Sequence, residues 1–536
     1  MAQRRGECVI LACNLLRTMR NRGLATAAQA IAADTGLEHR PVGDGQRVSG
    51  IYRRSLMLAS GRYAMLDDRK GFSLEPVLSL QRASFERDGA PSLARRRANL
   101  KKLRTAILAN KNEIAATIST DFGHRSQHET AVMELLTLVM GIDYLYKNLR
   151  RFMQPTHRHV ALTMRLGSAR IEYQPLGVVG IMAPWNYPFS LAAMPLATAL
   201  AAGNRAMIKP SELTPATSSL LAKLLADLFP EEQVAVVQGD ASLGAAFSAL
   251  SFDHLVFTGS TPVGRAVMRA ASENLVPVTL ELGGKSPAIV AKGYSLDRAA
   301  MGIAYGKFAN SGQTCVAPDY ALVPEQELER FVAAFDRAVR TLYPEGPTST
   351  DYTSIINERH HARLTGLIDD ARSRGARVFE VGPRAAEAAS RVRTLAPTLV
   401  LDINDDMKIM QDEIFGPVLP VKTYRSLDEA IDYVNAHPRP LALYYFGRND
   451  EDRSKVLSRT TSGNVTINAT LTHYAQEDLP FGGVGPSGMG AYHGIEGFRA
   501  LSHAKGVFVQ GRLNGADMLR APFGWLANMI LRVLLR

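Results

Sequence analysis

The sequence predicts an α/β protein with two main domains, because short β-rich runs alternate with helical stretches twice along the chain. The first alternation begins at Ile171, and the second follows Pro287. Strands that are separated by helical segments pair in parallel, since a parallel return needs a crossover connection. With 536 residues, of which 46% are hydrophobic, the chain is long enough to bury two such cores.

The segment before these domains, residues 1–72, mixes Gly, Arg and Ala without a sustained hydrophobic period. Such a composition predicts a mostly disordered extension, and Met65 is an alternative start for the chain. From Leu93 to Tyr146 the apolar residues recur at helical spacing among Lys, Arg and Glu. That periodicity predicts two or three amphipathic helices, which we interpret as scaffold rather than as chemistry.

Each domain contains runs of β-branched and other apolar residues that are short enough to be buried strands. In the first domain the expected strands are 178–183, 206–209, 234–238, 254–258 and 278–282. In the second they are 288–290, 320–323 and 418–423, and helical segments such as 325–342 separate them. No internal repeat or low-complexity linker lies between the two domains, so we expect them to be directly connected.

The net charge of +11 is concentrated at the two ends of the chain. Residues 1–72 hold 12 Lys and Arg against 6 Asp and Glu, and residues 505–536 hold 5 against 1, which leaves the body close to neutral. A nucleic-acid-binding face should place a basic stripe on the folded body, so nucleic acid is set aside as a partner. The basic ends are either solvated tails or contacts for an anionic membrane surface.

The chain has three cysteines, Cys8, Cys13 and Cys315, so neither a disulfide framework nor a four-cysteine zinc site can form, and we expect no metal. Few cysteines are typical of a reducing compartment. No apolar run reaches the roughly 18 residues that a membrane-spanning helix needs. Residues 8–16 resemble a weak secretory signal, but the arginines that follow interrupt it. We therefore expect a cytoplasmic protein.

The first candidate for chemistry is Cys315, which ends the segment Asn310-Ser-Gly-Gln-Thr-Cys315. Gly312 and its small neighbours allow a backbone turn that presents both the thiol and its own amide to a ligand. A single cysteine is more often a buried structural residue than a nucleophile. A catalytic role also needs an environment that activates the thiol and a partner that completes the reaction.

Glu281 and Asn186 are candidates for supporting roles. Glu281 lies at the end of the apolar run 278–282, just before two glycines. A carboxylate at such a strand end is partly desolvated, which raises its pKa toward that of a useful general base. Asn186, in the turn-rich segment 183–188, could donate its side-chain N–H to an oxyanion. The alternatives are a solvated glutamate and an asparagine that only caps a turn.

Two further segments follow short expected strands and suit a nucleotide. Lys209 and Glu212, in Lys-Pro-Ser-Glu, offer an ammonium and a carboxylate for a ribose. Gly259, Ser260 and Gly264 lie in Phe-Thr-Gly-Ser-Thr-Pro-Val-Gly, which opens a helix and suits a phosphate. Neither segment contains the G-x-G-x-x-G fingerprint, so a dinucleotide site here differs from an ordinary Rossmann site.

Two segments nearer the end of the chain have a weaker pattern. Glu413 and Phe415, in Gln-Asp-Glu-Ile-Phe-Gly-Pro, place a third carboxylate next to an aromatic ring. Residues 479–490 are dense in glycine, which more often indicates close backbone packing than a ligand site.

Together and in this order, the segments resemble the motifs of the aldehyde dehydrogenase superfamily. The matching runs are Pro-Trp-Asn-Tyr-Pro, Lys-Pro-Ser-Glu, Phe-Thr-Gly-Ser, Glu-Leu-Gly-Gly-Lys-Ser-Pro, Gly-Gln-Thr-Cys, Glu-Ile-Phe-Gly-Pro and Pro-Phe-Gly-Gly-Val-Gly. The short spacing from Glu281 to Cys315 and the late Ser-Gly-Met-Gly-Ala-Tyr-His are similar to the class 3 branch, especially its bacterial coniferyl-aldehyde dehydrogenase-like members. The resemblance implies oxidation of an aldehyde, aromatic or medium to long-chain aliphatic, to its carboxylic acid with NAD(P).

The resemblance also implies a role for each candidate residue. Cys315 is the nucleophile that forms a thioester, Asn186 and the Cys315 amide hold the oxyanion, and Glu281 activates the hydrolytic water. The other candidates bind the dinucleotide: Lys209 and Glu212 at the adenosine ribose, Gly259, Ser260 and Gly264 near the pyrophosphate, and Glu413, Phe415 and Trp185 near the nicotinamide ribose. Glu212 would repel a 2′-phosphate, so NAD is expected, and Lys209 leaves NADP open.

For the fold, the resemblance implies two doubly wound α/β domains plus a small β oligomerisation element. Residues 73–153 and 176–283 form the dinucleotide-binding domain, 284–460 the catalytic thiol domain, 154–175 and 461–505 the oligomerisation element with the glycine-rich loop, and 506–536 a basic amphipathic tail. Strands near 170–174 and 464–468 are expected to pair across a homodimer interface, since two-fold closure is common among soluble oligomers.

Three other interpretations stay open. A cysteine hydrolase would pair Cys315 with a distant histidine, of which His360, His361, His473 and His493 are available. The same fold could release an acyl-CoA or an acyl phosphate, although Glu281 favours hydrolysis. An inactive dehydrogenase fold at a membrane surface is suggested by 516–536, where apolar residues alternate with arginines as in a basic interfacial helix. The same tail could instead pack over the substrate entrance of a partner subunit.

Overall fold

The computed structural model describes residues 2–5, 8–11, 51–58, 61–67, 72–383, 391–512 and 515–535. In the N-terminal extension the described segments are antiparallel strands. They are β1 (Ala2–Arg5), β2 (Cys8–Leu11), β3 (Ile51–Leu58), β4 (Gly61–Asp67) and β5 (Phe72–Pro76). The remaining residues of 1–72, for which the sequence predicts disorder, lie outside the described residues.

A six-stranded sheet forms the first α/β domain, in the order β10-β9-β8-β11-β12-β20. Its strands are β8 (Val178–Met182), β9 (Arg205–Lys209), β10 (Val234–Val236), β11 (His254–Thr258), β12 (Val278–Glu281) and β20 (Gly488–Met489). All neighbours are parallel except β20, which pairs with β12 in the antiparallel direction. The five strands expected from the sequence are confirmed within two residues at each end. The strand order reverses between β8 and β11, which makes the carboxyl ends of these strands a topological switch point.

Helices pack on both faces of this sheet. Val179 and Ile181 of β8 belong to one core, whereas Val178 and Met182 belong to another, because successive strand residues point to opposite faces. Helices on the first face are α3 (Leu93–Ala109), α4 (Lys111–Phe122), α6 (Thr137–Phe152), α7 (Ser190–Ala202) and α8 (Pro215–Leu228). Those on the second are α2 (Val77–Asp88), α9 (Ala241–Ser248) and α10 (Thr261–Ser272). The expected helices of 93–146 are confirmed by α3, α4 and α6, with the short α5 (Gln127–Thr130) and π-helical η1 (Ala131–Leu136) between them.

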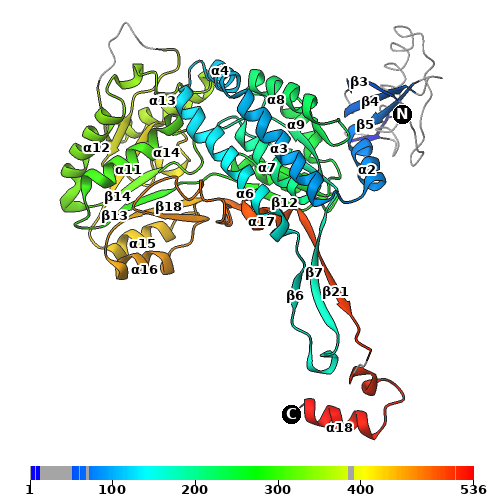
Figure 1. Cartoon of the computed structure of the whole chain (residues 1–536). Coiled ribbons are helices and arrows are strands. Elements are labelled where there is room, and N and C mark those ends of the chain that lie inside the picture. Colours follow the sequence, from blue (N-terminus) through cyan, green and yellow to red (C-terminus); the bar gives the residue numbers. More distant parts are fainter. Residues whose placement is uncertain are drawn as a thin grey trace.

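The second α/β domain contains a seven-stranded sheet in the order β15-β16-β17-β14-β13-β18-β19. Its strands are β13 (Pro287–Val290), β14 (Tyr320–Pro324), β15 (Arg377–Glu380), β16 (Thr398–Leu401), β17 (Val418–Tyr424), β18 (Ala442–Phe446) and β19 (Asn464–Ile467). Only β15 is antiparallel to its neighbour. Its helices are α11 (Leu296–Phe308), α12 (Leu328–Leu342), α13 (Glu358–Ser373), α14 (Lys408–Gln411), α15 (Leu427–Asn435) and α16 (Asp450–Arg459). The strands and the helical segment expected after Pro287 are therefore confirmed, and Figure 1 shows the two domains side by side.

A three-stranded antiparallel arm projects away from the first domain (Figure 1). It consists of β6 (Thr156–Arg158), β7 (Ser168–Pro175) and β21 (Ser502–Val509), which follows α17 (Gly494–Ala500). The segment 464–468, which the family resemblance groups with the oligomerisation element, lies elsewhere: its residues 464–467 are β19, the edge strand of the seven-stranded sheet.

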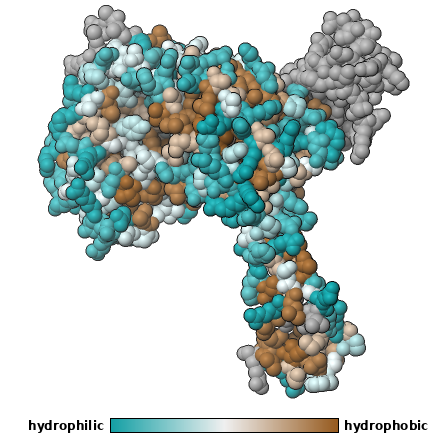
Figure 2. All heavy atoms as spheres, in the orientation of Figure 1, coloured by the Kyte–Doolittle hydropathy of each residue, from teal (hydrophilic) through white to brown (hydrophobic). Residues whose placement is uncertain are grey.

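The end of the chain lies near the far end of the arm (Figure 1). There η7 (Gly515–Leu519) and α18 (Trp525–Leu534) are two separate segments instead of the single helix expected over 516–536, and Pro522 lies between them. Phe523, Trp525, Val533 and Leu535 each expose at least 70% of their surface. Figure 2 shows apolar residues gathered at this end of the molecule. Among the described residues no helix combines the length and the apolar character needed to cross a membrane.

Close backbone packing explains the glycine-dense loop at 479–490. At Gly488, which pairs with Glu281 between β20 and β12, an added Cβ would lie 2.1 Å from the backbone oxygen of Leu280. Its φ of 141° is also one that side chains rarely adopt. The interpretation of this loop as a packing feature is therefore confirmed, and the loop covers the strand end that carries Glu281.

Candidate active site

Cys315 follows a turn of left-handed residues at the end of α11. In the 3-10 turn η3 (Ala309–Gly312), Asn310, Ser311 and Gly312 have φ values of 52°, 50° and 74°. Two of the three are not glycine, so the backbone carries strain that the surrounding contacts must hold. At Gly312 a Cβ would also lie 2.3 Å from the backbone oxygen of Gly416. Glycine is required at this position for both reasons.

Side-chain amides hold this turn in place. Asn310 Nδ2 donates to the backbone oxygens of Asn186 and Gln313, at 3.0 and 3.1 Å. The Gln313 side chain donates to the backbone oxygen of Ser354 at 3.1 Å and accepts from the N–H of Ile356 at 3.0 Å. The turn is therefore fixed by segments that are far apart in the sequence, and the position of Cys315 is fixed with it.

The Cys315 side chain is half-buried and packs against the larger hydrophobic core. Burial raises the pKa of its thiol to about 12, and the carboxylates of Glu413 and Glu281 add to this shift. The backbone N–H groups of Cys315 and Val316 act in the opposite direction. Burial and the two carboxylates therefore outweigh the two N–H dipoles of the turn at this thiol.

Asn186 lies in the turn between β8 and α7, with 3% of its surface exposed. Its Nδ2 donates to the backbone oxygen of Gln313 at 3.1 Å, two residues before Cys315. Beside it, the Tyr187 hydroxyl is 2.7 Å from Oγ1 of Thr314. The amide group thus lies against the turn that carries the thiol.

A buried ion pair that the sequence did not reveal supports the Asn186 turn. The side chains of Arg125 and Glu134 have no exposed surface, and Arg125 Nη1 lies 2.8 Å from Glu134 Oε1. Arg125 also donates to the backbone oxygen of Asn186 at 3.1 Å. Glu134 accepts from the N–H groups of Phe189 and Ser190, at 3.1 and 2.9 Å, where α7 begins. No local pattern marks either residue, because Arg125 lies in the short loop between α4 and α5, and Glu134 lies in the separate segment η1.

Glu281 ends β12, and only 3% of it is exposed. Neither of its carboxylate oxygens has a hydrogen-bond partner among the described residues. Burial therefore raises the pKa of Glu281 well above its usual value, in the direction expected from its strand-end position. Its charge also raises the pKa of Cys315, so the carboxylate lies near the thiol. A buried carboxylate with free acceptors is suited to take a proton from a water molecule.

Glu413 is a second buried carboxylate close to the thiol. Its Oε2 lies against Gly283, where an added Cβ would be 2.1 Å away. Burial, reinforced by Asp319, raises the pKa of Glu413 to about 8, although the Gly284 N–H and Lys285 act against the shift. The glycine pair after Glu281 therefore leaves room for Glu413, which links these two sequence motifs.

Charged groups behind Glu413 hold its loop. Lys285 Nζ lies 2.5 Å from Asp319 Oδ2 and donates to the backbone oxygens of Ile409 and Asp412 at 2.8 and 2.9 Å. Asp319 Oδ1 accepts from the N–H of Ile414 at 3.0 Å. Lys285 lies inside the quoted motif Glu-Leu-Gly-Gly-Lys-Ser-Pro, and Asp319 lies four residues after Cys315, which ends the quoted Gly-Gln-Thr-Cys. These motifs point to both residues, but the segment 409–414 that the two residues hold lies about 100 residues further along the sequence.

Aromatic rings line the same region. The rings of Trp185 and Phe415 meet edge to face, with centroids 5.4 Å apart. Trp185 also lies 5.0 Å from the His360 ring. Phe415 has a φ of 51°, so its loop is another strained segment beside the thiol. The motifs that contain Asn186, Cys315, Glu281, Glu413, Phe415 and Trp185 therefore meet between the two domains.

The other candidates gather at the carboxyl ends of β9 and β11, on either side of β8. Lys209 ends β9, is almost fully buried, and its Nζ lies 3.0 Å from Glu212 Oε2. Gly259 follows β11, and Ser260 caps α10 without a side-chain hydrogen bond to the helix. At Gly264 in the first turn of α10, an added Cβ would lie 2.6 Å from Leu282 Cδ2, so a larger residue would have to displace that leucine side chain.

This group fits a dinucleotide. A helix N-terminus without a side-chain cap offers free N–H groups to a pyrophosphate, and the switch point of a parallel sheet is where nucleotides bind. Lys209 and Glu212 are the charged pair next to it. By contrast, within the described residues no group of three or more His, Cys, Asp or Glu is arranged to hold a metal ion.

No histidine is among the groups that contribute most to the pKa of Cys315. The ring of His473 shares a hydrogen bond of 2.7 Å with the hydroxyl of Thr466, and burial lowers its pKa to about 4. Burial lowers the pKa of His493 to about 3. After burial, the groups that raise the pKa of Cys315 most are the carboxylates of Glu413 and Glu281. This geometry favours the carboxylate arrangement over a Cys–His pair.

Comparison with known proteins identifies the family that this site resembles. A model described as "Aldehyde dehydrogenase family" matches residues 79–507, and one described as "Protein of unknown function" matches residues 1–88. A "Probable coniferyl aldehyde dehydrogenase" from Pseudomonas aeruginosa is 51% identical over 87% of this chain and 97% of its own length. "Aldehyde dehydrogenase family 3 member A2" from Mus musculus is 39% identical over 83% of this chain and 90% of its own. The structure "Substrate bound state of Staphylococcus Aureus AldH" has a TM-score of 0.80 at 37% identity, covering 86% and 99% of the two chains.

Proposed function

The chain belongs to the aldehyde dehydrogenase family, which oxidises aldehydes to carboxylic acids with NAD(P), and from this premise we propose that it does so through a thioester on Cys315. The observation that carries the proposal is that Asn186 and Glu281 both lie near the turn of Cys315. Asn186 Nδ2 donates to the backbone oxygen of Gln313, two residues before the thiol, and the charge of Glu281 raises the pKa of Cys315. The test is direct. Purified protein with NAD and an aldehyde should produce NADH and the carboxylic acid, and absence of NADH with every aldehyde class would contradict it.

In the first half of the reaction, the Cys315 sulfur bonds to the aldehyde carbon, and the oxygen becomes an oxyanion. Asn186 Nδ2 and the Cys315 N–H donate to this oxyanion, and one such donor is typically worth about 3 kcal/mol in the transition state. The bound dinucleotide supplies the hydride acceptor. Because burial raises the pKa of the thiol to about 12 in the protein alone, the thiolate must form with help from positive charge brought to the site.

In the second half, Glu281 takes a proton from a water molecule that attacks the thioester carbon. The carbon–sulfur bond breaks, the carboxylic acid leaves and the thiol is restored. The two free oxygens of Glu281 suit this role, since a carboxylate already bonded to protein donors would be a weaker base. Water rather than coenzyme A or phosphate is therefore the proposed acyl acceptor. Product analysis with and without these acceptors tests this, and an acyl-CoA product would overturn it.

The dinucleotide is proposed to lie across the switch point of the first sheet. Lys209 and Glu212 would hold the adenosine ribose, and Gly259, Ser260 and Gly264 would lie at the pyrophosphate. Glu413, with Phe415 and Trp185 beside it, would hold the nicotinamide ribose. Glu212 favours NAD over NADP: burial opposes its ionisation, but the N–H of its own backbone and Lys209 keep its pKa below the usual range. An ionised carboxylate here repels a 2′-phosphate.

Replacing Glu212 with Gln should therefore raise kcat/KM with NADP relative to NAD by about tenfold, which corresponds to about 1.4 kcal/mol. The substitution removes the charge and keeps the shape of the side chain. Initial rates with both cofactors measure the ratio. Glu273→Gln, an exposed position on the same domain, is the matched control and should leave the ratio unchanged. An unchanged ratio in Glu212→Gln would remove this residue from the ribose site.

We expect the substrate to be an aromatic aldehyde of the coniferyl type, with medium and long-chain aliphatic aldehydes as the alternative. Aromatic and apolar side chains surround the proposed acyl site, and the relative that is 51% identical is described as a probable coniferyl aldehyde dehydrogenase. A panel of aromatic, medium-chain and long-chain aldehydes compared by kcat/KM discriminates these classes. A preference for long aliphatic chains would contradict the aromatic assignment.

A homodimer is proposed to form through the arm and through β19. β19 is the edge strand of its sheet, so its outer edge can pair with another strand, and the arm projects an apolar end from the body. Light scattering in solution should give twice the chain mass of 58.4 kDa. A monomer at micromolar concentration would contradict the proposal.

A second contact of the tail is proposed, between the apolar residues and arginines of 512–535 and an anionic membrane surface. Full-length protein should pellet with anionic vesicles more than a chain that ends after Arg512, which keeps the whole of β21. Neutral vesicles are the control. Equal pelleting of the two chains would remove the membrane contact and favour packing of the tail on a partner subunit.

A further inference from the structure

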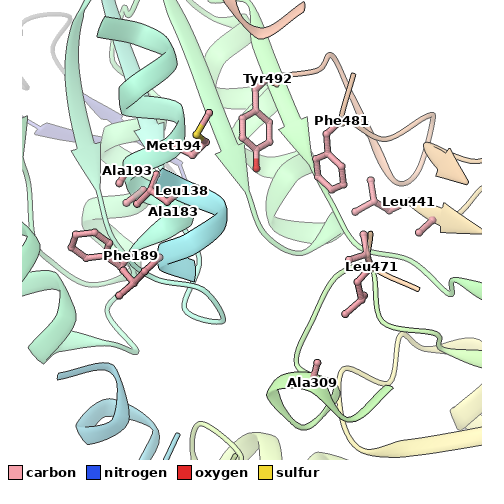
Figure 3. Close-up of a cluster of buried hydrophobic side chains, with 14 of the residues drawn as sticks. Leu138, Ala183, Phe189, Ala193, Met194, Ala309, Leu441, Leu471, Phe481 and Tyr492 are labelled. Carbon is pink, nitrogen blue, oxygen red and sulfur yellow. The ribbon is translucent and has the colours of Figure 1, made fainter. Parts of the chain in front are cut away.

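Two tyrosines, Tyr474 and Tyr492, lie near the thiol. Tyr474 and Tyr492 both contact Phe481, with ring centroids 5.0 and 6.1 Å away. Burial raises the pKa of each tyrosine, and Cys315 contributes to both shifts, so both rings lie near the thiol. Figure 3 shows Tyr492 between Met194 and Phe481, with its hydroxyl directed into the space that these side chains surround.

Glu477 lies beyond Tyr474 in this row. After burial, Glu477 is the largest cause of the raised pKa of Tyr474, which places the two side chains together. On its other side Glu477 meets α6 and α7: an added Cβ at Gly141 would lie 2.9 Å from Glu477 Oε1 and 2.8 Å from Met194 Sδ. Tyr474 therefore stands between the thiol and a carboxylate.

The second oxygen of Glu477 makes no hydrogen bond to the described residues. Oε2 is buried and lacks a hydrogen-bond partner among the described residues. Glu134, a carboxylate that only supports the fold, is paired with Arg125 and with two backbone N–H groups. The neighbouring Asp478 is exposed and accepts from the hydroxyl of Tyr144. A buried acceptor that is left free costs stability, and a ligand that donates a hydrogen bond to it would recover that cost.

The chemistry of the row defines the ligand. A flat apolar ring can lie along Tyr474, Tyr492 and Met194 with its aldehyde at Cys315, and it then presents its far end to Glu477. A hydroxyl at that end would donate to Oε2. We propose that Glu477 determines specificity for aldehydes that carry a ring hydroxyl para to the aldehyde-bearing group. This deepens, and rests on, the proposed oxidation of aromatic aldehydes at Cys315.

A hydroxyl fits this position better than a cation. At the Glu477 end of the row the neighbouring groups are the Tyr474 ring, the Met194 thioether and Gly141, so a charged amine would lose its hydration and gain few compensating contacts. Burial raises the pKa of Glu477 to about 7, which weakens its pull on a cation further. A neutral hydroxyl suits both forms of Glu477. It can donate a hydrogen bond to the ionised carboxylate, and its oxygen can accept a hydrogen bond from the protonated carboxyl group.

The test compares 4-hydroxycinnamaldehyde with 4-methoxycinnamaldehyde. The first carries a ring hydroxyl that can donate a hydrogen bond, and in the second a methyl group replaces the donor proton. The wild-type protein should prefer the hydroxyl compound by roughly tenfold to a hundredfold in kcat/KM, the range for a hydrogen bond to a charged group. Glu477→Leu should reduce the preference to about one, mainly through KM for the hydroxyl compound. Glu477→Gln should keep part of it, because an amide oxygen still accepts. Glu496→Gln, a half-buried glutamate on α17, is the matched control and should keep the full preference.

Each outcome separates this inference from the proposed function. Loss of activity toward both compounds by the same factor in Glu477→Leu would mean a structural role and would overturn the inference, while leaving the Cys315 chemistry intact. A wild-type protein that oxidises both compounds equally would also overturn it. A wild-type protein that yields no NADH with any aldehyde would contradict the proposed function itself. Rates for hexanal, which has no ring hydroxyl, should be the same in wild type and both Glu477 variants.

Discussion

Replacing Cys315 with Ala should reduce aldehyde oxidation by on the order of 10⁴-fold or more, as expected when a nucleophile is removed from a catalytic group. The other groups remain in place in this variant, because the turn is held by Asn310 and Gln313 rather than by the thiol. They cannot act, however, since without sulfur no covalent intermediate forms to release hydride or to be hydrolysed. Steady-state NADH formation and single-turnover traces measure the loss.

The matched control replaces Cys8 and Cys13 with Ser. Both precede residues 79–507, which the family model matches, so the double variant should keep full activity. An equal melting temperature for wild type and Cys315→Ala would exclude unfolding as the cause. Substantial NADH formation by Cys315→Ala would remove Cys315 from the reaction.

Alkylation offers a second measurement on the same thiol. Because burial and two carboxylates raise the pKa of Cys315 to about 12, only a small fraction is thiolate at neutral pH in the protein without cofactor. Its rate of reaction with iodoacetamide should rise with pH across the whole stable range, and should rise at fixed pH when NAD is bound. A rate that is already maximal at pH 7 without NAD would mean that the turn alone stabilises the thiolate.

Much of the fold follows from local sequence. The runs around Val179 and Ile181 are apolar and short, and buried parallel strands require that composition, so their bounds are predicted within two residues. The motif order indicates the aldehyde dehydrogenase superfamily and its class 3 branch, and the comparisons confirm both. The fold class is confirmed by the same family match and by the structural likeness.

The parts that the sequence did not predict depend on contacts between distant segments. The Arg125–Glu134 pair supports Asn186 from about 60 residues away, and neither charge is marked by local spacing. The raised pKa of Cys315 was not predicted either, because the turn is local but the burial comes from the whole domain junction. Glu477 was overlooked for the same reason, since only the packing of α6 and α7 against its loop leaves its oxygen buried and free.

Replacing Glu281 with Gln should keep the first turnover and slow the later ones. Thiol attack and hydride transfer need Cys315 and Asn186, so a burst of about one NADH per active site should remain. Hydrolysis needs a base, and Gln has none, so steady-state turnover should fall by about 10²- to 10⁴-fold, the usual contribution of general base catalysis. Stopped-flow absorbance resolves the burst from the steady state. Glu451→Gln, an exposed position on α16, is the matched control and should show neither change.

The pH dependence distinguishes a base from a residue that only shapes the site. Only the ionised form of Glu281 accepts a proton, and burial raises its pKa well above the usual value, so wild-type turnover should increase with pH as this group ionises. In Glu281→Gln that increase should be absent from the hydrolytic step, while the burst should keep the pH dependence set by the Cys315 thiol. A variant with normal steady-state turnover would remove Glu281 as the base. A variant that loses the burst in proportion to turnover would mean that Glu281 acts before the thioester forms, at the thiol itself.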